Sequence, residues 1–323
     1  MNYPGAKEEP RWAIVLSGGE GKRMQSLTQR WLGNNRPKQY CTFVGSRSML
    51  EHTIDRAGSI VPPDRIVTVI GNGHRTYIDR NFNSKGRIIE QPQSRDTLPG
   101  VLLPASHISS TDPSATLLIF PSDHFIYPEE KFLEYAAQAA SLAERLNNQI
   151  VLLATVPEYP EPEYGWIEPG DLISAAFGKP ARAVRRFHEK PSKVAARRFY
   201  SRCWLCNTMV MAVKLHTLWS VAQKFFPELI RRFELIRDTL NSMRQIEEAQ
   251  YQTPVLTRLY QNMPSVNISH DLLMKIPERI VTLRMEGVHW NDWGQPSRVV
   301  ESLARIGKRP AFPLDYADEP VYA

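Results

Sequence analysis

The chain has 323 residues, of which 42% are hydrophobic and 23% charged, and its formal net charge at pH 7 is +6. These values are typical of a globular protein, and the length suits one large α/β domain or two smaller ones. The apolar runs are far shorter than the roughly 20 residues of a membrane span, so we expect no membrane association. The first eleven residues contain no apolar segment, so we expect no signal peptide and a cytoplasmic protein.

The basic residues are spread along the chain instead of forming one block, and no DNA- or RNA-binding signature accompanies them. The positive charge therefore favours small polyphosphates over nucleic acid as ligands. The three cysteines, Cys41, Cys203 and Cys206, are too few for a disulfide framework. The spacing of Cys203 and Cys206 occurs in zinc sites, but no second pair is present to complete four ligands.

The first half of the chain alternates strand and helix patterns. Apolar, β-branched runs predict strands at 12–17, 65–70, 87–91, 116–121 and 149–156. Helical patterns lie between them at 49–60, 98–108 and 129–146. Strands that are apolar throughout and are separated by helices predict a parallel sheet covered on both faces. Ligands bind such sheets beyond the carboxyl ends of the strands.

The second half is less regular. Residues 157–171 are rich in Pro and Glu and predict an extended loop over the site. Further elements are expected as strands at 183–190 and 208–214 and as helices at 192–201 and within 215–261. No internal repeat or linker is apparent. We therefore expect one domain, residues 1–309, followed by a C-terminal tail, residues 310–323.

A glycine-rich turn with the sequence SGGEGKR follows the first expected strand at 17–23. It is not a Walker A loop, because Arg23 stands where Ser or Thr is required. It is not a dinucleotide fingerprint, because Met24 replaces the third small residue. Consecutive glycines let backbone amides approach an anion, and two cations follow, so the loop predicts a nucleoside triphosphate site. A tight turn with a solvated Lys-Arg pair is the alternative.

Seven further motifs follow the loop in order: RPKQY at 36–40, QPQSRDTLP at 91–99, FPSDHF at 120–125, EYGWIEPG at 163–170, FHEKPS at 187–192, CNT at 206–208 and WNDWG at 290–294. This ordered set resembles the sugar-phosphate nucleotidylyltransferases, and within them the mannose-1-phosphate guanylyltransferases. The resemblance runs from about Ile14 to about Leu303. It implies a Rossmann-like nucleotide-diphospho-sugar transferase fold of the α/β class, with a mixed, mostly parallel sheet flanked by helices.

The resemblance also implies a reaction. A sugar-1-phosphate oxygen attacks the α-phosphorus of a nucleoside triphosphate, pyrophosphate leaves, and a nucleotide-sugar forms. GTP and mannose 1-phosphate are the implied substrates, GDP-mannose the product and Mg²⁺ the cofactor, and a homodimer is left open. The nucleophile is already an anion, so positioning and charge neutralisation are required more than a general base.

On the nucleotide side, the resemblance implies four groups of residues. The glycine-rich signature matches Ser17, Gly18, Gly19 and Gly21, of which Gly18 and Gly19 would meet the base and ribose. Arg23 would bind the β- and γ-phosphates and Lys38 the α-phosphate. The base would be held by Gln91, Arg95 and Thr97. Asp123 and Asp292 would be the Mg²⁺ ligands, since that ion prefers hard oxygens.

On the sugar side, the resemblance implies that Gly165 lets the chain pass close to the sugar. Glu189 and Asn207 would contact sugar hydroxyls, and Lys190 would hold the sugar phosphate.

Two departures from the family pattern also fall on the sugar side: Met209 replaces a glycine, and Ser269 replaces an aspartate. Two alternatives therefore stay open. One is the same reaction with another base or sugar. The other is a catalytically weak relative that binds nucleotide-sugars as a regulator.

Overall fold

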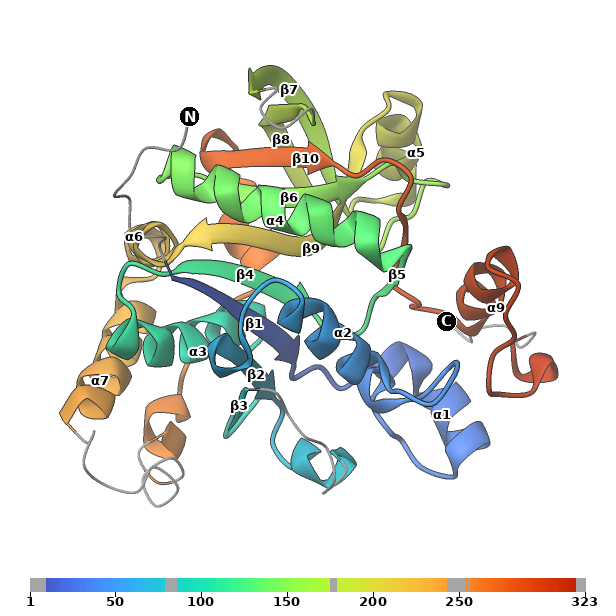
Figure 1. Cartoon of the computed structure of the whole chain (residues 1–323), viewed down its shortest axis with the longest axis horizontal. Coiled ribbons are helices and arrows are strands. Elements are labelled where there is room, and N and C mark those ends of the chain that lie inside the picture. The colour runs from blue at the N-terminus through green and yellow to red at the C-terminus, as the bar shows by residue number, and fades with distance from the viewer. Residues whose placement is uncertain (1–9, 79–85, 175–178, 243–253, 255, 318–323) are drawn as a thin grey trace.

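The computed structural model describes residues 10–78, 86–174, 179–242, 254 and 256–317. A nine-stranded sheet in the order β3-β2-β1-β4-β9-β6-β10-β8-β7 runs through the centre of the described chain (Figure 1). Its strands are β1 (Arg11–Ser17), β2 (Ile66–Ile70), β3 (Arg87–Glu90), β4 (Thr116–Pro121), β6 (Ile150–Thr155), β7 (Gly165–Ser174), β8 (Ala181–Glu189), β9 (Leu205–Lys214) and β10 (Ile280–Arg284). A separate two-stranded ribbon pairs β5 (Phe125–Tyr127) with β11 (His289–Asn291).

The sheet is mixed, as expected, but it is not clearly mostly parallel. Strands β3, β2, β1 and β4 run parallel, and β6 runs parallel to β10. Strand β9 lies antiparallel between β4 and β6, and β8 is antiparallel to both β10 and β7. An apolar strand indicates burial on both faces. The apolar pattern does not indicate the direction of a strand. The antiparallel pairings come from β9, which lies between β4 and β6, and from β8, which pairs with β10 and β7.

Helices cover both faces of the sheet. On one face α2 (Met49–Gly58) and α4 (Glu129–Leu146) share a core cluster with Ala13 and Val15 of β1. On the other face α3 (Thr97–Thr111), α6 (Leu215–Phe225) and α7 (Pro227–Ser242) pack with Ile14 of the same strand. Successive strand side chains point to opposite faces, so the unbroken apolar run in β1 serves both layers.

The observed elements match most of the expected ones, with two differences. The loop expected at 157–171 ends early, because β7 begins at Gly165 and pairs along its length with β8. The helical stretch expected within 215–261 is divided at Phe226, where Pro227 begins a new helix. Residues 243–253 and 255 of that stretch lie outside the described residues.

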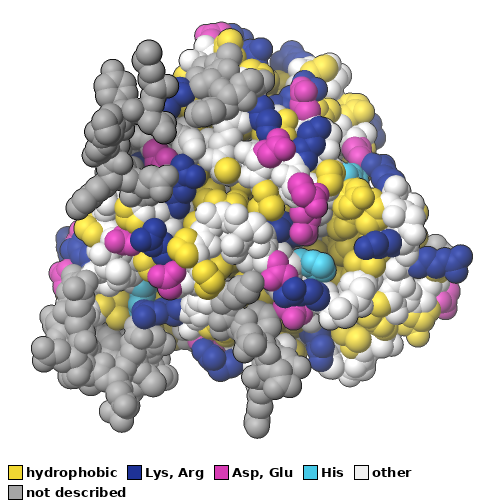
Figure 2. Space-filling model, in the orientation of Figure 1, with side chains coloured by type: hydrophobic (Ala, Val, Ile, Leu, Met, Phe, Trp, Pro, Cys, Tyr) yellow, Lys and Arg dark blue, Asp and Glu magenta, His cyan; other side chains and the backbone are white. Residues whose placement is uncertain are grey.

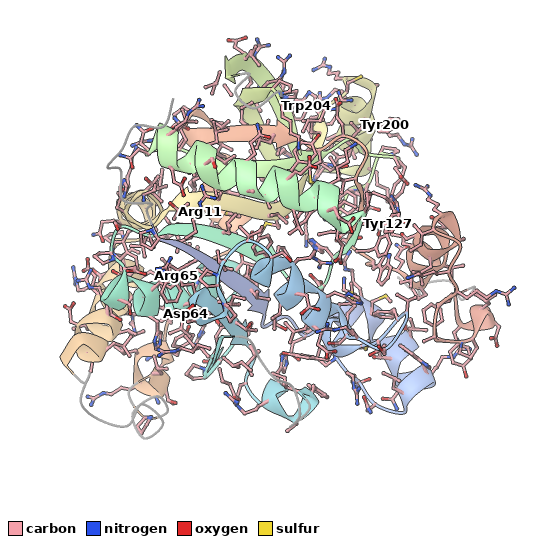
Figure 3. All side chains as sticks on the ribbon, viewed as in Figure 1. Arg11, Asp64, Arg65, Tyr127, Tyr200 and Trp204 are labelled. Atoms are coloured by element: carbon pink, nitrogen blue, oxygen red, sulfur yellow. The ribbon has the colours of Figure 1, made fainter. Side chains whose placement is uncertain are left out.

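Local contacts fix the outer elements. Ser192 caps α5 (Lys193–Ser201) through the backbone N–H of Ala195. The Phe199 ring of this helix stacks on Trp204, with ring centroids 4.0 Å apart. Figure 3 labels Trp204 beside α5, and it labels Arg11 at the start of β1, where Arg11 Nε donates to Glu144 of α4 at 2.7 Å. Figure 2 shows hydrophobic side chains gathered beside β5, flanked by charged groups.

A third hydrophobic cluster joins α1 (Gln25–Leu32) and α9 (Pro296–Arg305) to the body of the protein. It includes Phe43, Trp293 and the buried ring of Phe312. The Ala311 N–H donates to the Phe43 carbonyl at 2.8 Å. The described part of the expected tail, residues 310–317, thus packs on the domain. None of the described helices is long and apolar enough to cross a membrane.

Candidate functional site

A cavity of about 470 Å³ opens beyond the carboxyl ends of β1 and β4. The predicted nucleotide residues that line it are Ser17, Gly18, Gly19, Gly21, Gln91, Thr97 and Asp123. These residues come from separate segments of the chain. The structure therefore brings together most of the nucleotide side that the sequence predicts, at the edge where α/β sheets bind ligands.

Two side chains of the motif RPKQY hold the glycine-rich loop through hydrogen bonds. The Gln39 side-chain amide donates to the carbonyls of Ser17, at 3.1 Å, and Gly19, at 2.7 Å. The Tyr40 hydroxyl also donates to the Ser17 carbonyl, at 3.0 Å. These hydrogen bonds fix the carbonyls of the loop and hold the loop in one conformation beside the cavity.

Two glycines of the loop have no room for a side chain. A Cβ on Gly18 would lie 2.7 Å from Gln91 Nε2, and a Cβ on Gly21 would lie 2.9 Å from the backbone nitrogen of Lys38. Gly21 also has a φ of +61°, which favours glycine. These contacts thus explain why the loop needs glycine at both positions.

Some buried polar atoms of the predicted site have no hydrogen-bond partner among the described residues. Among them are Oε1 of Gln91, at the cavity, and Nδ2 of Asn207. Buried polar atoms are nearly always paired in folded proteins. Gln91 Oε1 and Asn207 Nδ2 are therefore an acceptor and a donor with unused hydrogen-bonding capacity.

Lys38 contacts both predicted metal-binding aspartates, one through its carboxylate and the other through its backbone carbonyl. Its buried ammonium lies 3.0 Å from Oδ2 of Asp123 and also donates to the backbone carbonyl of Asp292. Burial alone would raise the pKa of the Asp123 carboxyl, but Lys38 and then His124 outweigh it and hold that pKa below its usual value. Asp123 is therefore a carboxylate at neutral pH, and its side chain remains 38% exposed at the cavity.

His124 is oriented by its neighbours. The Trp290 indole N–H donates to Nδ1 at 3.3 Å, which leaves the proton of a neutral ring on Nε2, 3.5 Å from Oδ1 of Asp123. Burial is the main cause that lowers the pKa of this imidazole. A neutral His124 therefore faces Asp123.

Asp292 lies at the centre of a buried charge network. Arg23 Nη2 donates to Oδ2 at 3.0 Å, whereas Oδ1 accepts from Arg298 Nη1 at 2.8 Å and from the Tyr164 hydroxyl at 3.1 Å. Arg298 also pairs with Glu161. Burial would raise the pKa of Asp292, but a lysine and two arginines outweigh it and hold that pKa well below its usual range.

The donor set can be compared with what Mg²⁺ requires. In the described part of the chain, no three His, Cys, Asp or Glu side chains gather to hold a metal. Magnesium at nucleotide sites is held by one or two carboxylates plus phosphate oxygens and water. The partly exposed carboxylate of Asp123 fits such an ion. Asp292 fits as a second ligand only when Arg23 leaves its Oδ2.

The predicted sugar residues form a second group next to the cavity. A Cβ on Gly165 would lie 2.6 Å from Oε2 of Glu189 and 3.2 Å from the Cβ of Asn207, so these three residues meet closely. Burial raises the pKa of Glu189 to about 7, with Lys190 opposing the shift. The Lys190 side chain is exposed, 3.9 Å from Glu163.

Arg95 is placed differently from the other predicted base-binding residues. Its Nη2 donates to the carbonyl of Tyr260, at 3.1 Å, and to Oε1 of Gln93. Arg95 is not among the residues that line the 470 Å³ cavity. Its hydrogen bond to the Tyr260 carbonyl instead links the segment around residue 95 to the segment around residue 260.

A larger cavity of about 700 Å³ lies near Tyr127, Glu158 and Arg305. Its charged groups are engaged with each other, since Arg305 pairs with Glu158 and Arg284 with Glu286. The smaller cavity is the better candidate for a phosphate ligand, because it is lined by the glycine-rich loop, whose backbone amides can approach an anion.

Three features of the site were missed by the sequence analysis. Gln39 and Tyr40 hold the loop, although their motif was recognised only for Lys38. Tyr164 stood in a recognised motif without a role. Arg298 gave no signal, because an arginine in an amphipathic helix is ordinarily solvated.

Comparison with known proteins places these features in a wider group. A nucleotidyl transferase family model matches residues 12–308. Over 310 residues the chain is 26% identical to a mannose-1-phosphate guanylyltransferase from Escherichia coli, covering 93% of this chain and 62% of that protein. It is 27% identical over 304 residues to the xanthan biosynthesis protein XanB from Xanthomonas campestris pv. campestris, covering 91% and 60%.

The chain thus spans about three fifths of the length of these curated relatives. A solved structure from Thermus thermophilus, described as a mannose-1-phosphate geranyltransferase, superposes with a TM-score of 0.74 at 24% identity. The superposition covers 93% of this chain and 79% of that one, and it shows a shared fold.

Proposed function

The chain belongs to the nucleotidyl transferase family, and from this premise we propose that it transfers a nucleotidyl group from GTP to mannose 1-phosphate, forming GDP-mannose and pyrophosphate. The observation that carries the proposal is the cavity in which the glycine-rich loop faces Asp123, whose carboxylate pairs with the buried Lys38. Relatives named for mannose-1-phosphate guanylyl transfer support the choice of substrates.

The proposed base site rests on Gln91. Its unpaired Oε1 is an acceptor, and guanine offers two neighbouring donors, the ring N1–H and the exocyclic amine. The absence of a side chain at Gly18 leaves the Gln91 amide in place beside the loop. Thr97 lines the same end of the cavity.

The proposed phosphate site rests on two cations. Lys38 is buried and fixed, so it neutralises charge at one place without reorganising. Arg23 is half exposed and pairs with Asp292 through one oxygen, so it can turn to the leaving pyrophosphate. Positioning and charge neutralisation of this kind dominate phosphoryl-group chemistry.

We assign the proposed Mg²⁺ to Asp123 first and Asp292 second. When bound, the ion would neutralise phosphate charge and polarise the α-phosphate. Lys38 would orient Asp123 through its Oδ2 atom, and His124 would face its Oδ1 atom.

The proposed sugar site is the group of Gly165, Glu189 and Asn207. An ionised Glu189 would accept hydrogen bonds from sugar hydroxyls, and the unpaired Nδ2 of Asn207 would donate one. The exposed ammonium of Lys190 would attract the sugar phosphate.

Pyrophosphate release tests the proposal. GTP, ATP, CTP and UTP are each combined with Mg²⁺ and with mannose 1-phosphate, glucose 1-phosphate and other sugar 1-phosphates. We expect release with GTP and mannose 1-phosphate. Release with a different pair only would keep the reaction and overturn the substrates.

One observation favours a second candidate, a regulator that binds nucleotide-sugars. Met209 lines the cavity, and its sulfur accepts a hydrogen bond from the Ser269 hydroxyl. A site obstructed in this way could bind without turnover. Nucleotide-sugar binding by calorimetry, together with no pyrophosphate release from any pair, would select that candidate.

A further inference from the structure

Met209 has an unusual backbone conformation in the middle of β9. Its φ is +60°, in the left-handed region that side chains avoid. The pairing of β9 with β6 shifts register at this point, from Leu152 opposite Met211 to Ala154 opposite Asn207. Irregularities of this kind re-aim side chains next to functional sites.

The bulge is held from both sides. The Thr208 hydroxyl donates to the Leu153 carbonyl at 2.7 Å, and the Met209 N–H donates to Oδ1 of Asn207 at 3.1 Å. The surrounding strands therefore maintain the strained backbone, and the side chain of Met209 is directed to the cavity lining.

A second segment fixes the Met209 side chain. The hydroxyl of the buried Ser269 donates to Sδ of Met209 at 2.9 Å. Ser269 belongs to a π-helix (Ile268–Leu272) whose first N–H donates to Oγ1 of Thr97 at 2.8 Å. The thioether is thus tied, through Ser269, to the same segment that lines the base end of the cavity.

Met209 stands at the border between the two halves of the site. It lines the nucleotide cavity, whereas Gly165, Glu189 and Asn207 lie outside that lining. Its own N–H nevertheless binds Asn207. Met209 therefore borders both the cavity and the group that contains Asn207 and Glu189.

We propose that Met209, fixed by Ser269, is the specificity-determining residue of the sugar end: its side chain fills the space that an N-acetyl group would need, so the site takes unsubstituted hexose 1-phosphates and rejects N-acetylhexosamine 1-phosphates. This inference rests on the proposed nucleotidyl transfer and names the sugar class within it. A flexible methionine ordinarily adapts to its surroundings. Here the strained backbone and the Ser269 hydroxyl remove that freedom.

The test compares substrates that differ only at C2. The kcat/KM for pyrophosphate release is measured with mannose 1-phosphate against N-acetylmannosamine 1-phosphate, and with the corresponding glucose pair. Wild type, Met209→Gly, Met209→Leu and Ser269→Ala are compared. Leucine keeps the bulk and removes the sulfur, so Met209→Leu is the matched control for volume.

We expect Met209→Gly to raise the N-acetyl to unsubstituted ratio at least tenfold, and Ser269→Ala to raise it several-fold by releasing the thioether. Met209→Leu should leave the ratio within about threefold of wild type. A folded Met209→Gly protein that turns over hexose 1-phosphates with an unchanged ratio would overturn the inference and leave the proposed function standing.

If wild type releases no pyrophosphate with any pair, the proposed function fails, and calorimetric binding of the same sugar phosphates in the presence of GTP decides the inference. Tighter binding of the N-acetyl compounds to Met209→Gly than to wild type would support it. Equal binding by both proteins would overturn it.

Discussion

Asp292 shows how a carboxylate is kept charged without solvent. Arg23 and Arg298 occupy different oxygens, and the Tyr164 hydroxyl adds a neutral donor. Asp123 pairs with Lys38 and stays partly exposed. The two carboxylates therefore differ in role: Asp123 can take up a ligand as it stands, whereas Asp292 must exchange an arginine first.

Asp123→Asn tests the role of the exposed carboxylate. The amide oxygen can still accept from Lys38, but this buried ammonium loses its charged partner, so we expect the free energy of unfolding to fall by about 1–3 kcal/mol. Turnover should fall by about 100-fold or more, because a neutral amide binds a divalent cation weakly. Near-normal kcat at saturating Mg²⁺ would refute the metal assignment. Urea unfolding of both proteins provides the control.

Glu189 predicts a pH dependence. Its pKa is about 7 in the folded protein against an ordinary value of 4.5, because burial disfavours the charged form. Between these values the folded protein binds a proton that the unfolded chain has released, so this group lowers stability as pH rises from 4.5 through 7. The same rise ionises the carboxylate, so KM for the sugar phosphate should fall between about pH 6 and 8.

Glu189→Gln separates this effect from the ionisation of the substrate. The phosphate group of the substrate titrates in the same pH range, but it does so equally with both proteins. The change of KM with pH that wild type shows and Glu189→Gln lacks is therefore caused by Glu189. A KM profile that is identical in the two proteins would contradict the assignment.

At the scale of elements, the conformation of the glycine-rich loop depends on the segment that hydrogen-bonds to it. A short 3₁₀ helix, Lys38–Tyr40, supplies Gln39 and Tyr40 as donors to the loop carbonyls. The backbone of Lys38 fills the space beside Gly21. The loop and the RPKQY motif therefore form one unit, although 14 residues separate Gly21 from Arg36 in the sequence.

Gly21→Ala and Gly33→Ala test this unit as a matched pair. Both glycines have a positive φ, +61° and +71°, but nothing lies within 4 Å of a Cβ on Gly33. Gly33→Ala should therefore lose only about 1–2 kcal/mol of stability, because of backbone strain, and it should bind GTP normally. Gly21→Ala adds the clash with Lys38, so we expect a larger loss of stability and at least tenfold weaker GTP binding by calorimetry. Equal behaviour of the two variants would show that the contact is unimportant.

At the scale of the whole molecule, the third hydrophobic cluster connects the C-terminal residues to the site. Trp293 stacks on Phe125 with ring centroids 4.7 Å apart, and Phe43 contacts both Trp293 and Phe312 edge to face. Trp293 is the neighbour of Asp292 in the chain. Packing around Phe312 thus supports the loop that presents Asp292.

Phe312→Ala should lower the free energy of unfolding by about 3–5 kcal/mol, as expected for loss of a buried ring. Turnover should fall as well, because the position of Asp292 depends on Trp293. The control is Leu314→Ala, two residues further on, where the side chain is 51% exposed. We expect that variant to change stability by less than about 1 kcal/mol in urea unfolding, and equal losses in both would show that the cluster contributes nothing special.

The local elements could be predicted because their signals are local. The helix expected at 129–146 coincides with α4, and the strands expected in the first half were found to within about two residues at each end. The nucleotide residues were implied by the family resemblance of the motifs, several of which follow strand ends, where side chains converge. Arg95 was predicted with them, yet its partner is the distant carbonyl of Tyr260, which no local pattern indicates.

The sequence by itself determined the α/β class and the glycine-rich loop, because these depend on periodicity and on backbone freedom, and the family resemblance of its motifs singled out the two carboxylates. Only the tertiary structure decided the mixed sheet, since strand direction depends on where β9 inserts. It alone placed Arg298 on Asp292 and Ser269 on Met209, pairs separated by 6 and 60 residues. Such contacts are set by the packing of whole elements, and a side chain's own sequence neighbours do not reveal them.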